Sequence, residues 1–308
     1  MLPDTTRMGL VTLVTARIAP LREFYAGLLG LRVLGETAEG VTLGTDTPLL
    51  ALIQDVAAPP PPAHATGLYH IALRVPDRAA LGRVLHGLLA ARYPLQGAAC
   101  HFVSEALYLA DPDGNGIEIT ADTPRETWRQ RADGQLRIGT AALDAPGLLA
   151  VARTGDGPLL DGGSDVGHVH LKVADLVAAE ALYVGVLGFA VMMRMPGALF
   201  VAAGGYHHHL GLNTWESRGG PTPAPGSQGL QGFTLVLPDL HDRAALLARA
   251  AAAGVVIHDN VLIDPWGHQI AIGPLSGRSA IRPYIGPALS GASFSSSSIS
   301  CRLSPVPR

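Results

Sequence analysis

The residues best suited to chemistry lie in one short run, HFVSEALYLADPDGNGIEI (101–119). The run predicts a strand, a turn and a second strand, because turn-forming residues at 111–116 separate two apolar segments. Glu118 stands between two isoleucines, and a carboxylate in that setting is costly to bury unless a cation meets it. We expect His101, Tyr108 and Glu118 to point toward one cavity, which is what a metal oxygenase site needs.

The elements that would position these residues recur along the chain. Each repeat reads as a short strand, a helix that stops near a glycine, and further strands. Residues 70–75, for example, alternate between apolar and other side chains in the pattern of a half-buried strand. Four such units open at residues 9–34, 68–89, 167–192 and 232–257.

Length and composition limit the class of protein. The chain has 308 residues, 48% of them hydrophobic, which is enough for about two domains with a sizeable core. Its 22 basic and 25 acidic residues give a net charge of −3 without a basic block, so we expect no nucleic-acid partner. Cys100 and Cys301 do not make a disulfide framework and indicate a reducing compartment. The N-terminus does not resemble a signal peptide and no run is long enough to cross a bilayer, so we expect a cytoplasmic protein.

The repeats predict a chain of two halves. Residues 8–122 would form an N-terminal domain from the first two units, and residues 165–274 a C-terminal domain from the other two. Residues 123–164 would link the halves. The tail at 275–308 is rich in serine and is expected to be poorly ordered.

Four βαβββ units of this kind resemble the vicinal oxygen chelate superfamily over about residues 8–273. In that superfamily, paired units curve their strands into a cup that holds a divalent metal. The resemblance implies an α+β fold of four βαβββ modules with mixed, curved sheets.

Within that superfamily, residues 101–118 are similar to the signature of extradiol ring-cleavage dioxygenases. The stretches GHVHLKVADL (167–176) and GYHHHLGLNTW (205–215) look closest to the two-domain catechol 2,3-dioxygenases of bacteria. The signature positions are filled by His101, Leu107-Tyr108, Asp111-Pro112, Gly114 and Glu118.

The resemblance also implies a ligand set. In these enzymes a histidine in the first strand of each of two paired units and a glutamate in the last strand of one unit bind the metal. Here those positions hold His70, His168 and Glu118, whereas the first and fourth units offer Leu10 and Gly232. The implied cofactor is Fe(II), with Mn(II) as the alternative because it accepts the same ligands. The second and third units would then have to meet, although the best-known extradiol enzymes use the third and fourth.

Three consecutive histidines, 207–209, precede a short apolar segment. If this segment is a strand, alternation places His208 on the face opposite its two neighbours. Matching it to the family puts His208 at the position of the acid–base histidine, with His209 as the reserve. The competing interpretation is a mobile surface turn.

Four more side chains take roles from the resemblance. His101 and Tyr108 would hydrogen-bond the substrate oxygens or dioxygen. His170, two residues beyond the ligand in its strand, would support the ligands from behind, and Phe200 would line the ring pocket.

The implied activity is Fe(II)-dependent extradiol (meta) cleavage of a catechol by dioxygen, giving a 2-hydroxymuconic semialdehyde-type product, in a homo-oligomer as is common in the family. One alternative is a glyoxalase-type isomerase, which uses four ligands with a carboxylate in the last strand of both paired units. Residues 207–213 contain no glutamate, which argues against it. The other alternative is a non-catalytic small-molecule-binding protein of the same fold, which would need no metal triad.

Overall fold

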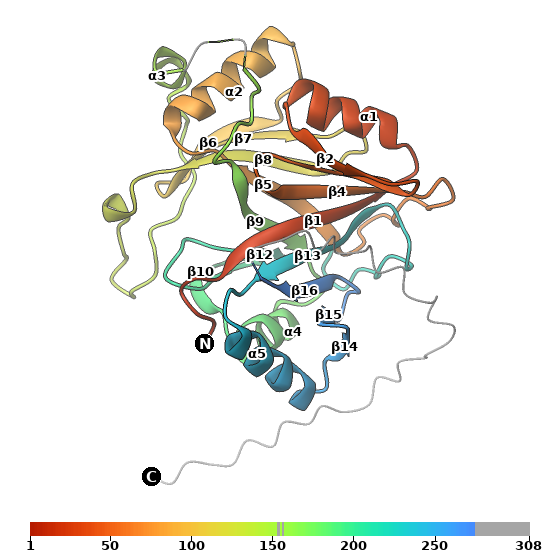
Figure 1. The fold of residues 1–308 in the computed structure, drawn as a ribbon. Helices are drawn as coiled ribbons and strands as arrows, with labels where there is room; N and C mark the ends of the chain where they lie inside the picture. Colours follow the sequence, from red (N-terminus) through yellow and green to blue (C-terminus); the bar gives the residue numbers. More distant parts are fainter. Residues whose placement is uncertain (153–154, 156, 275–308) are drawn as a thin grey trace.

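A computed structural model describes residues 1–152, 155 and 157–274. The serine-rich tail at 275–308 lies outside the described residues. Figure 1 shows strands through the middle of the molecule and helices on two opposite sides, with α1 (Ile18–Arg22) and α2 (Arg78–Ala90) on one side and α4 (Leu176–Glu180) and α5 (Leu240–Ala252) on the other. This arrangement confirms the predicted α+β class.

The first and fourth modules share one sheet. Its eight described strands follow the order β14-β15-β16-β13-β1-β4-β3-β2. The antiparallel pairing of β1 with β13 joins the two modules. The strands are β1 (Arg7–Thr15), β2 (Arg32–Glu36), β3 (Gly40–Gly44), β4 (Pro48–Gln54), β13 (Gly229–Val236), β14 (Val256–His258), β15 (Val261–Ile263) and β16 (Gln269–Gly273).

The second and third modules share the other sheet, in the order β10-β11-β12-β9-β5-β8-β7-β6. Antiparallel pairing of β5 with β9 joins them, so the two modules that carry the predicted ligands do meet. Each sheet therefore takes one module from each predicted half, while the division at 123–164 stays a prediction. The strands are β5 (Gly67–Arg74), β6 (Gly97–Cys100), β7 (Ser104–Ala110), β8 (Gly116–Asp122), β9 (Asp165–Lys172), β10 (Ala190–Met195), β11 (Ala198–Ala202) and β12 (Leu210–Asn213).

Aspartates cap the N-termini of the helices in the last three modules. Asp77, Asp175 and Asp239 each accept hydrogen bonds from backbone N–H groups in the first turn of α2, α4 and α5, and these N–H groups have no partner within the helix. Wider helical turns extend two helices: η1 (Glu23–Leu28) follows α1 and η3 (Ala181–Val186) follows α4. The segment between the predicted halves holds η2 (Arg125–Thr127) and α3 (Ala145–Ala150).

A tyrosine from the helix of one module fixes the last turn of the next. Tyr25 donates to Asp111 at 2.9 Å, and Tyr183 donates to Asp264 at 2.9 Å. Asp111 opens the β7–β8 turn, so its role in the predicted signature is structural. These paired contacts hold the turns that set the register of the following strands.

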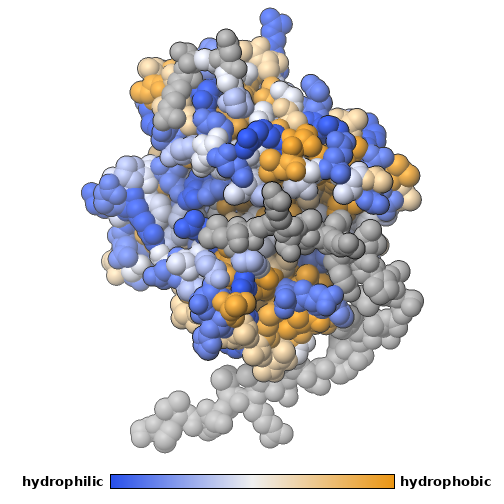
Figure 2. All heavy atoms as spheres, in the orientation of Figure 1, coloured by the Kyte–Doolittle hydropathy of each residue, from blue (hydrophilic) through white to orange (hydrophobic). Residues whose placement is uncertain are grey.

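The core lies between the sheets and their helices. In the sheet of modules two and three, Ile71, Leu73 and Leu171 are buried in it. Because successive strand residues point to opposite faces, the residues between them lie on the other face of the sheet. Figure 2 shows apolar residues gathering on the visible surface near α5 and β14. Val256 of β14 is an exposed apolar residue. Among the described residues, no helix has both the length and the apolar character needed to cross a bilayer.

Candidate metal centre

Strand pairing places the predicted residues in one row across the second sheet. Ala72 on β5 pairs with Glu118 on β8 and with His168 on β9. Glu118 in turn pairs with Tyr108 on β7. Paired residues share a face of the sheet, and the small side chain of Ala72 leaves room between His168 and Glu118.

His70 completes the group from the neighbouring row, two residues before Ala72. Its Nε2 lies 3.0 Å from Nε2 of His168 and 3.0 Å from Oε2 of Glu118. His168 Nε2 lies 3.3 Å from the same carboxylate oxygen. All three residues are buried, with 7%, 1% and 3% of the surface of His70, His168 and Glu118 exposed. The three sequence-predicted ligands therefore converge on one point.

The geometry of this group fits a metal ion. One donor atom from each of His70, Glu118 and His168 lies within 4.8 Å of the others. An octahedral ion with bonds of about 2.1 Å holds adjacent ligand atoms about 3.0 Å apart, close to the separations in this site. Two imidazoles and one carboxylate are the donor set of non-haem iron centres that keep positions open.

The charges of Glu118 and His168 also suit a cation. Burial raises the pKa of Glu118, but the adjacent His168 and His70 outweigh it and hold that pKa well below its usual range. Burial lowers the pKa of His168 to about 4, against the opposing effect of Glu118. An ionised carboxylate and a neutral imidazole are the forms that bind metal.

His208 is the histidine of the cluster that reaches the triad. Its ring lies on that of His168, with centroids 4.0 Å apart, and edge-to-face against Phe200 at 5.1 Å. Burial and the neighbouring histidines hold the pKa of His208 well below its ordinary value. A neutral imidazole therefore stands beside the proposed ligands, with Phe200 at its edge.

The three histidines lie in a bend before β12 and not in a strand. Strict alternation therefore does not apply, and Nδ1 of His207 lies 2.8 Å from Nδ1 of His208. His209 accepts a hydrogen bond from the backbone N–H of Ala203 at 3.2 Å and packs on Tyr206, with ring centroids 4.9 Å apart. All three histidines are buried, so the bend is not a surface turn.

Tyr108 and His101 form a hydrogen-bonded pair. Nδ1 of His101 donates to the carbonyl of Gly139 at 2.6 Å, which leaves Nε2 to accept from the phenol of Tyr108 at 2.6 Å. Burial and the charge of Glu118 raise the pKa of Tyr108, so the phenol stays protonated. Gly139 belongs to the segment between the predicted halves, which therefore helps to shape the site.

His170 packs against the proposed ligand His70. Its Nε2 accepts from the side-chain amide of Asn213 at 3.0 Å, and its ring stands perpendicular to that of His70, with centroids 4.9 Å apart. Gly211 pairs with His170 across β9 and β12. A Cβ on Gly211 would come within 2.7 Å of the His170 ring, so only glycine leaves that ring in place.

Gly211 occupies the position in the third module that corresponds to Glu118 in the second. Glu118 pairs with the residue two positions after His70, and Gly211 pairs with the residue two positions after His168. The two modules thus repeat the same pattern, with a carboxylate in one and a glycine in the other. The site thus offers three candidate ligands and no side chain for a fourth at the matching position.

Two aromatic residues next to the site were missed in the sequence. Tyr69 contacts the rings of His170 and Trp215, with centroids 4.9 and 5.4 Å apart, and Trp215 is 45% exposed. The register between β5 and β9 shifts between Leu68 and His70. This irregularity breaks the alternation that would have assigned Tyr69 to the opposite face.

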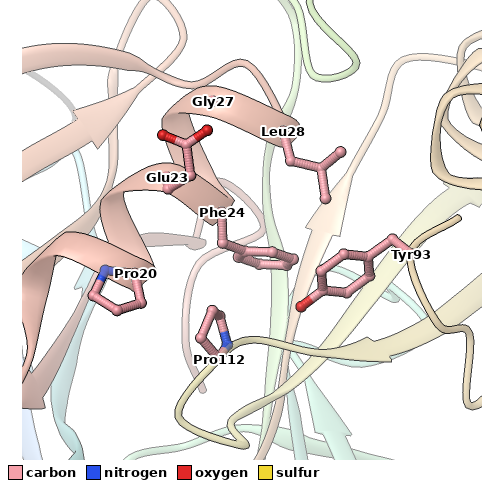
Figure 3. A pocket seen from close by; sticks show the side chains of 7 residues that line it. All are labelled: Pro20, Glu23, Phe24, Gly27, Leu28, Tyr93 and Pro112. Carbon is pink, nitrogen blue, oxygen red and sulfur yellow. The ribbon is translucent and has the colours of Figure 1, made fainter. Parts of the chain in front are cut away.

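A separate surface hollow lies away from the triad. It has a volume of about 380 Å³ and is open to solvent between the first helix and the β7–β8 turn (Figure 3). Its walls are mostly apolar and include no residue of the predicted site: Pro20, Glu23, Phe24, Gly27, Leu28, Tyr93 and Pro112. We therefore place the chemistry at the triad and not in this hollow.

Known proteins resemble the chain over most of its length. Residues 7–119 and 165–276 match the model of the family described as "Glyoxalase/Bleomycin resistance protein/Dioxygenase superfamily". A Bacillus subtilis (strain 168) protein named Catechol-2,3-dioxygenase is 39% identical over 261 residues, which cover 83% of this chain and 91% of the relative.

Solved structures share the fold. One, of a protein from Bacillus subtilis subsp. subtilis str. 168, has a TM-score of 0.60 at 13% identity and covers 88% of this chain and 86% of its own. Glyoxalase I from Zea mays has a TM-score of 0.51 at 14% identity, covering 87% of this chain and 92% of its own. At such identities the likeness extends to the fold alone.

Proposed function

Since this chain belongs to the Glyoxalase/Bleomycin resistance protein/Dioxygenase superfamily, we propose that it is an Fe(II)-dependent dioxygenase. It cleaves a catechol-type diol beside the two hydroxyl groups and yields a 2-hydroxymuconic semialdehyde-type product. The observation that carries the proposal is the convergence of His70, Glu118 and His168 at separations of 3.0 to 3.3 Å. The 39% identity to a protein named Catechol-2,3-dioxygenase supports the substrate class.

His70, His168 and Glu118 would hold the metal. Fe(II), or Mn(II) with the same ligands, would supply open coordination positions and the redox chemistry that couples an aromatic diol to dioxygen. Two of these residues are already in their metal-binding forms, since burial keeps His168 neutral and the two histidines keep Glu118 ionised.

His208 is the proposed acid–base group. It is neutral and buried, and its ring rests on that of His168. A neutral imidazole accepts a proton from a substrate hydroxyl and returns it when the ring opens, and groups placed in this way typically contribute about 10²–10⁴-fold in rate.

Tyr108 and His101 are proposed to orient the substrate oxygens. The hydrogen bond to His101 fixes the phenol oxygen, and a lone pair of that oxygen remains to accept from a diol hydroxyl. Phe200 and His170 pack edge-to-face, with centroids 5.5 Å apart, beside the same triad, where they would border the substrate ring.

The two alternatives predict other sites. A glyoxalase-type isomerase would need a fourth ligand in the third module, where Gly211 stands at the position matching Glu118. Burying a carboxylate against two imidazoles costs free energy, and a bound cation offsets that cost. A non-catalytic binding protein without a metal would lack this compensation. A homo-oligomeric state and a cytoplasmic location remain predictions.

Metal analysis of the purified protein, followed by an assay with catechol in air, tests the proposal. Iron or manganese with a yellow ring-fission product supports the dioxygenase. Nickel or zinc without ring fission would favour the isomerase, and a protein that binds no metal would favour the binding protein.

A further inference from the structure

We infer that Ile138 and Met193, together with Phe200, select the ring substituent of the catechol and favour an alkyl group over a carboxylate. The inference rests on the proposed function, whose substrate class it narrows. Ile138 belongs to the segment between the predicted halves, and Met193 belongs to β10. Neither residue is among the proposed ligands or the proposed acid–base groups.

Met193 lies in the same cross-strand row as a proposed metal ligand. His70 pairs with His170, which pairs in turn with Gly211. Gly211 pairs with Phe200, and Phe200 pairs with Met193. Paired residues share a face of the sheet, so the row runs from the triad across β9, β12 and β11 to β10.

The far end of this row is apolar. Met193, Ala198 and Phe200 form a small buried cluster that is separate from the main core, and Ile138 packs against this cluster. Leu199, which lies between Ala198 and Phe200 on β11, belongs to the main core on the opposite face. Because successive strand residues point to opposite faces, the cluster lies on the same side of the sheet as the triad.

Phe200 connects this cluster to the proposed reaction site. Its ring lies edge-to-face against His170 and His208, with centroids 5.5 and 5.1 Å apart. A catechol bound at the triad would meet Phe200, and a group added to the catechol ring on that side would extend toward Met193 and Ile138. These two side chains therefore form the wall that a substituent contacts.

Hydrogen bonds on both sides of Ile138 hold it against the cluster. The side-chain oxygen of Gln135 accepts from the backbone N–H of Arg194 on β10 at 3.0 Å. The carbonyl of Gly139 accepts from His101 at 2.6 Å. Since both ends of this short segment are attached to the sheet that carries the triad, the size of the Ile138 side chain should limit the size of the substituent.

The charges beside this wall favour a neutral substituent. Arg194 forms a two-pronged ion pair with Glu180, and the guanidinium of Arg137 lies over the ring of Phe102, 4.7 Å from its centroid. A carboxylate against the apolar cluster would lose water without meeting a cation, which is unfavourable. An alkyl group would gain from the same burial.

Steady-state kinetics of the Fe(II)-loaded enzyme with matched substrates test the preference for a neutral group. Ethylcatechol and dihydroxyphenylacetate carry side chains of similar length, neutral in the first and anionic in the second. Each is assayed with the side chain at ring carbon 3 or 4. We expect the wild-type kcat/KM to be about 10-fold or more higher for the ethylcatechol, because the carboxylate must be desolvated.

Two alanine variants test the size limit. Ile138→Ala and Met193→Ala should each raise kcat/KM for 4-tert-butylcatechol relative to catechol by about 10-fold or more, since one methylene in an apolar pocket is typically worth about 10–200-fold. Ile138→Leu conserves the volume and should keep the wild-type ratio. Ile257→Ala makes the same change on β14 of the other sheet and is the matched control.

Anaerobic calorimetric titration of the same Fe(II)-loaded proteins gives a readout that needs no turnover. Ile138→Lys should bind dihydroxyphenylacetate more tightly than the wild type does, because its ammonium group supplies a counter-charge. A wild-type preference for dihydroxyphenylacetate would overturn the inference. So would a ratio for tert-butylcatechol that both alanine variants leave unchanged while circular dichroism shows them folded.

The titration also separates this inference from the proposed function. Catechols that bind with the expected selectivity and are not cleaved in air would contradict the proposed function alone. A wild type that binds none of the catechols would overturn both.

Discussion

The imidazole of His208 lies on that of His168, with ring centroids 4.0 Å apart. The contact joins the bend before β12 to a proposed metal ligand on β9. The two neighbours of His208 in sequence make other contacts. His207 forms a hydrogen bond with Asp122, and His209 packs on Tyr206. His208 contacts the proposed ligand His168 but is not itself proposed to bind the metal. A substitution of His208 should therefore affect turnover more than metal content.

His208→Phe should therefore keep its metal and bind catechol, yet turn over about 10²–10⁴-fold more slowly. The loss should be smaller with a nitrocatechol, because its more acidic hydroxyl has less need of a base. Steady-state rates with both substrates, alongside metal analysis, check this expectation. An equal loss with both substrates would remove the acid–base role, and a severe loss in His209→Phe instead would transfer it to the reserve histidine.

Alanine at His70, His168 or Glu118 should abolish both metal retention and activity. A site with three protein ligands has no spare, and Gly211 offers no side chain to replace one. Metal content by mass spectrometry after dialysis, compared with circular dichroism to confirm folding, measures the effect. A folded variant that kept the wild-type metal content and rate would show that its residue is not a ligand.

Tyr108→Phe and His101→Asn should keep the metal and slow turnover about 10–100-fold. Both changes break the 2.6 Å hydrogen bond between the two side chains without touching the triad. Metal analysis and kcat on the same preparations are the measurements. If either variant lost its metal, the residue would belong among the ligands.

The metal-free protein should lose stability as the pH falls below about 6.5. Burial lowers the pKa of His209 to about 3, whereas an unfolded chain takes up this proton near pH 6.5. The stabilising contribution of neutral His209 is thus present above pH 6.5 and is lost progressively as the pH falls toward 3. Between about pH 6 and 5, this one group adds about 1.3 kcal/mol per pH unit to the slope of the unfolding free energy.

Urea unfolding of wild type and His209→Asn across that range isolates the contribution. The asparagine oxygen can still accept from the backbone of Ala203, so the variant removes the titrating group and keeps the hydrogen bond. Its slope should be smaller by nearly one proton. His86→Gln removes an exposed histidine of α2 and is the matched control. Identical slopes for His209→Asn and wild type would refute the prediction.

Much of the fold could be predicted because it depends on local patterns, and the proposed ligand set followed from the family resemblance. The turn residues at 111–116 and the alternation around His70, Glu118 and His168 placed these three residues on strands. The resemblance made them the proposed ligands and implied that the second and third modules must meet. The structure joins these two modules through the pairing of β5 with β9.

The parts that could not be predicted depend on irregular geometry or on distant contacts. Tyr69 reaches the site through an irregular register, and 207–209 form a bend where strand alternation does not hold. Gly139 receives the hydrogen bond of His101 from 38 residues away. The partnership of His207 with Asp122 spans 85 residues, and no spacing rule connects them.

Isotope labelling of the product tests the central claim most directly. The protein is loaded with Fe(II) without oxygen, then given catechol and ¹⁸O₂, and the product is analysed by mass spectrometry. Ring cleavage beside the diol by a dioxygenase predicts a yellow semialdehyde acid that gains one molecule of dioxygen per catechol, with label from ¹⁸O₂, and no product from a His168→Ala control. Intact catechol after loading, or a product opened between the two hydroxyl groups, would contradict the account.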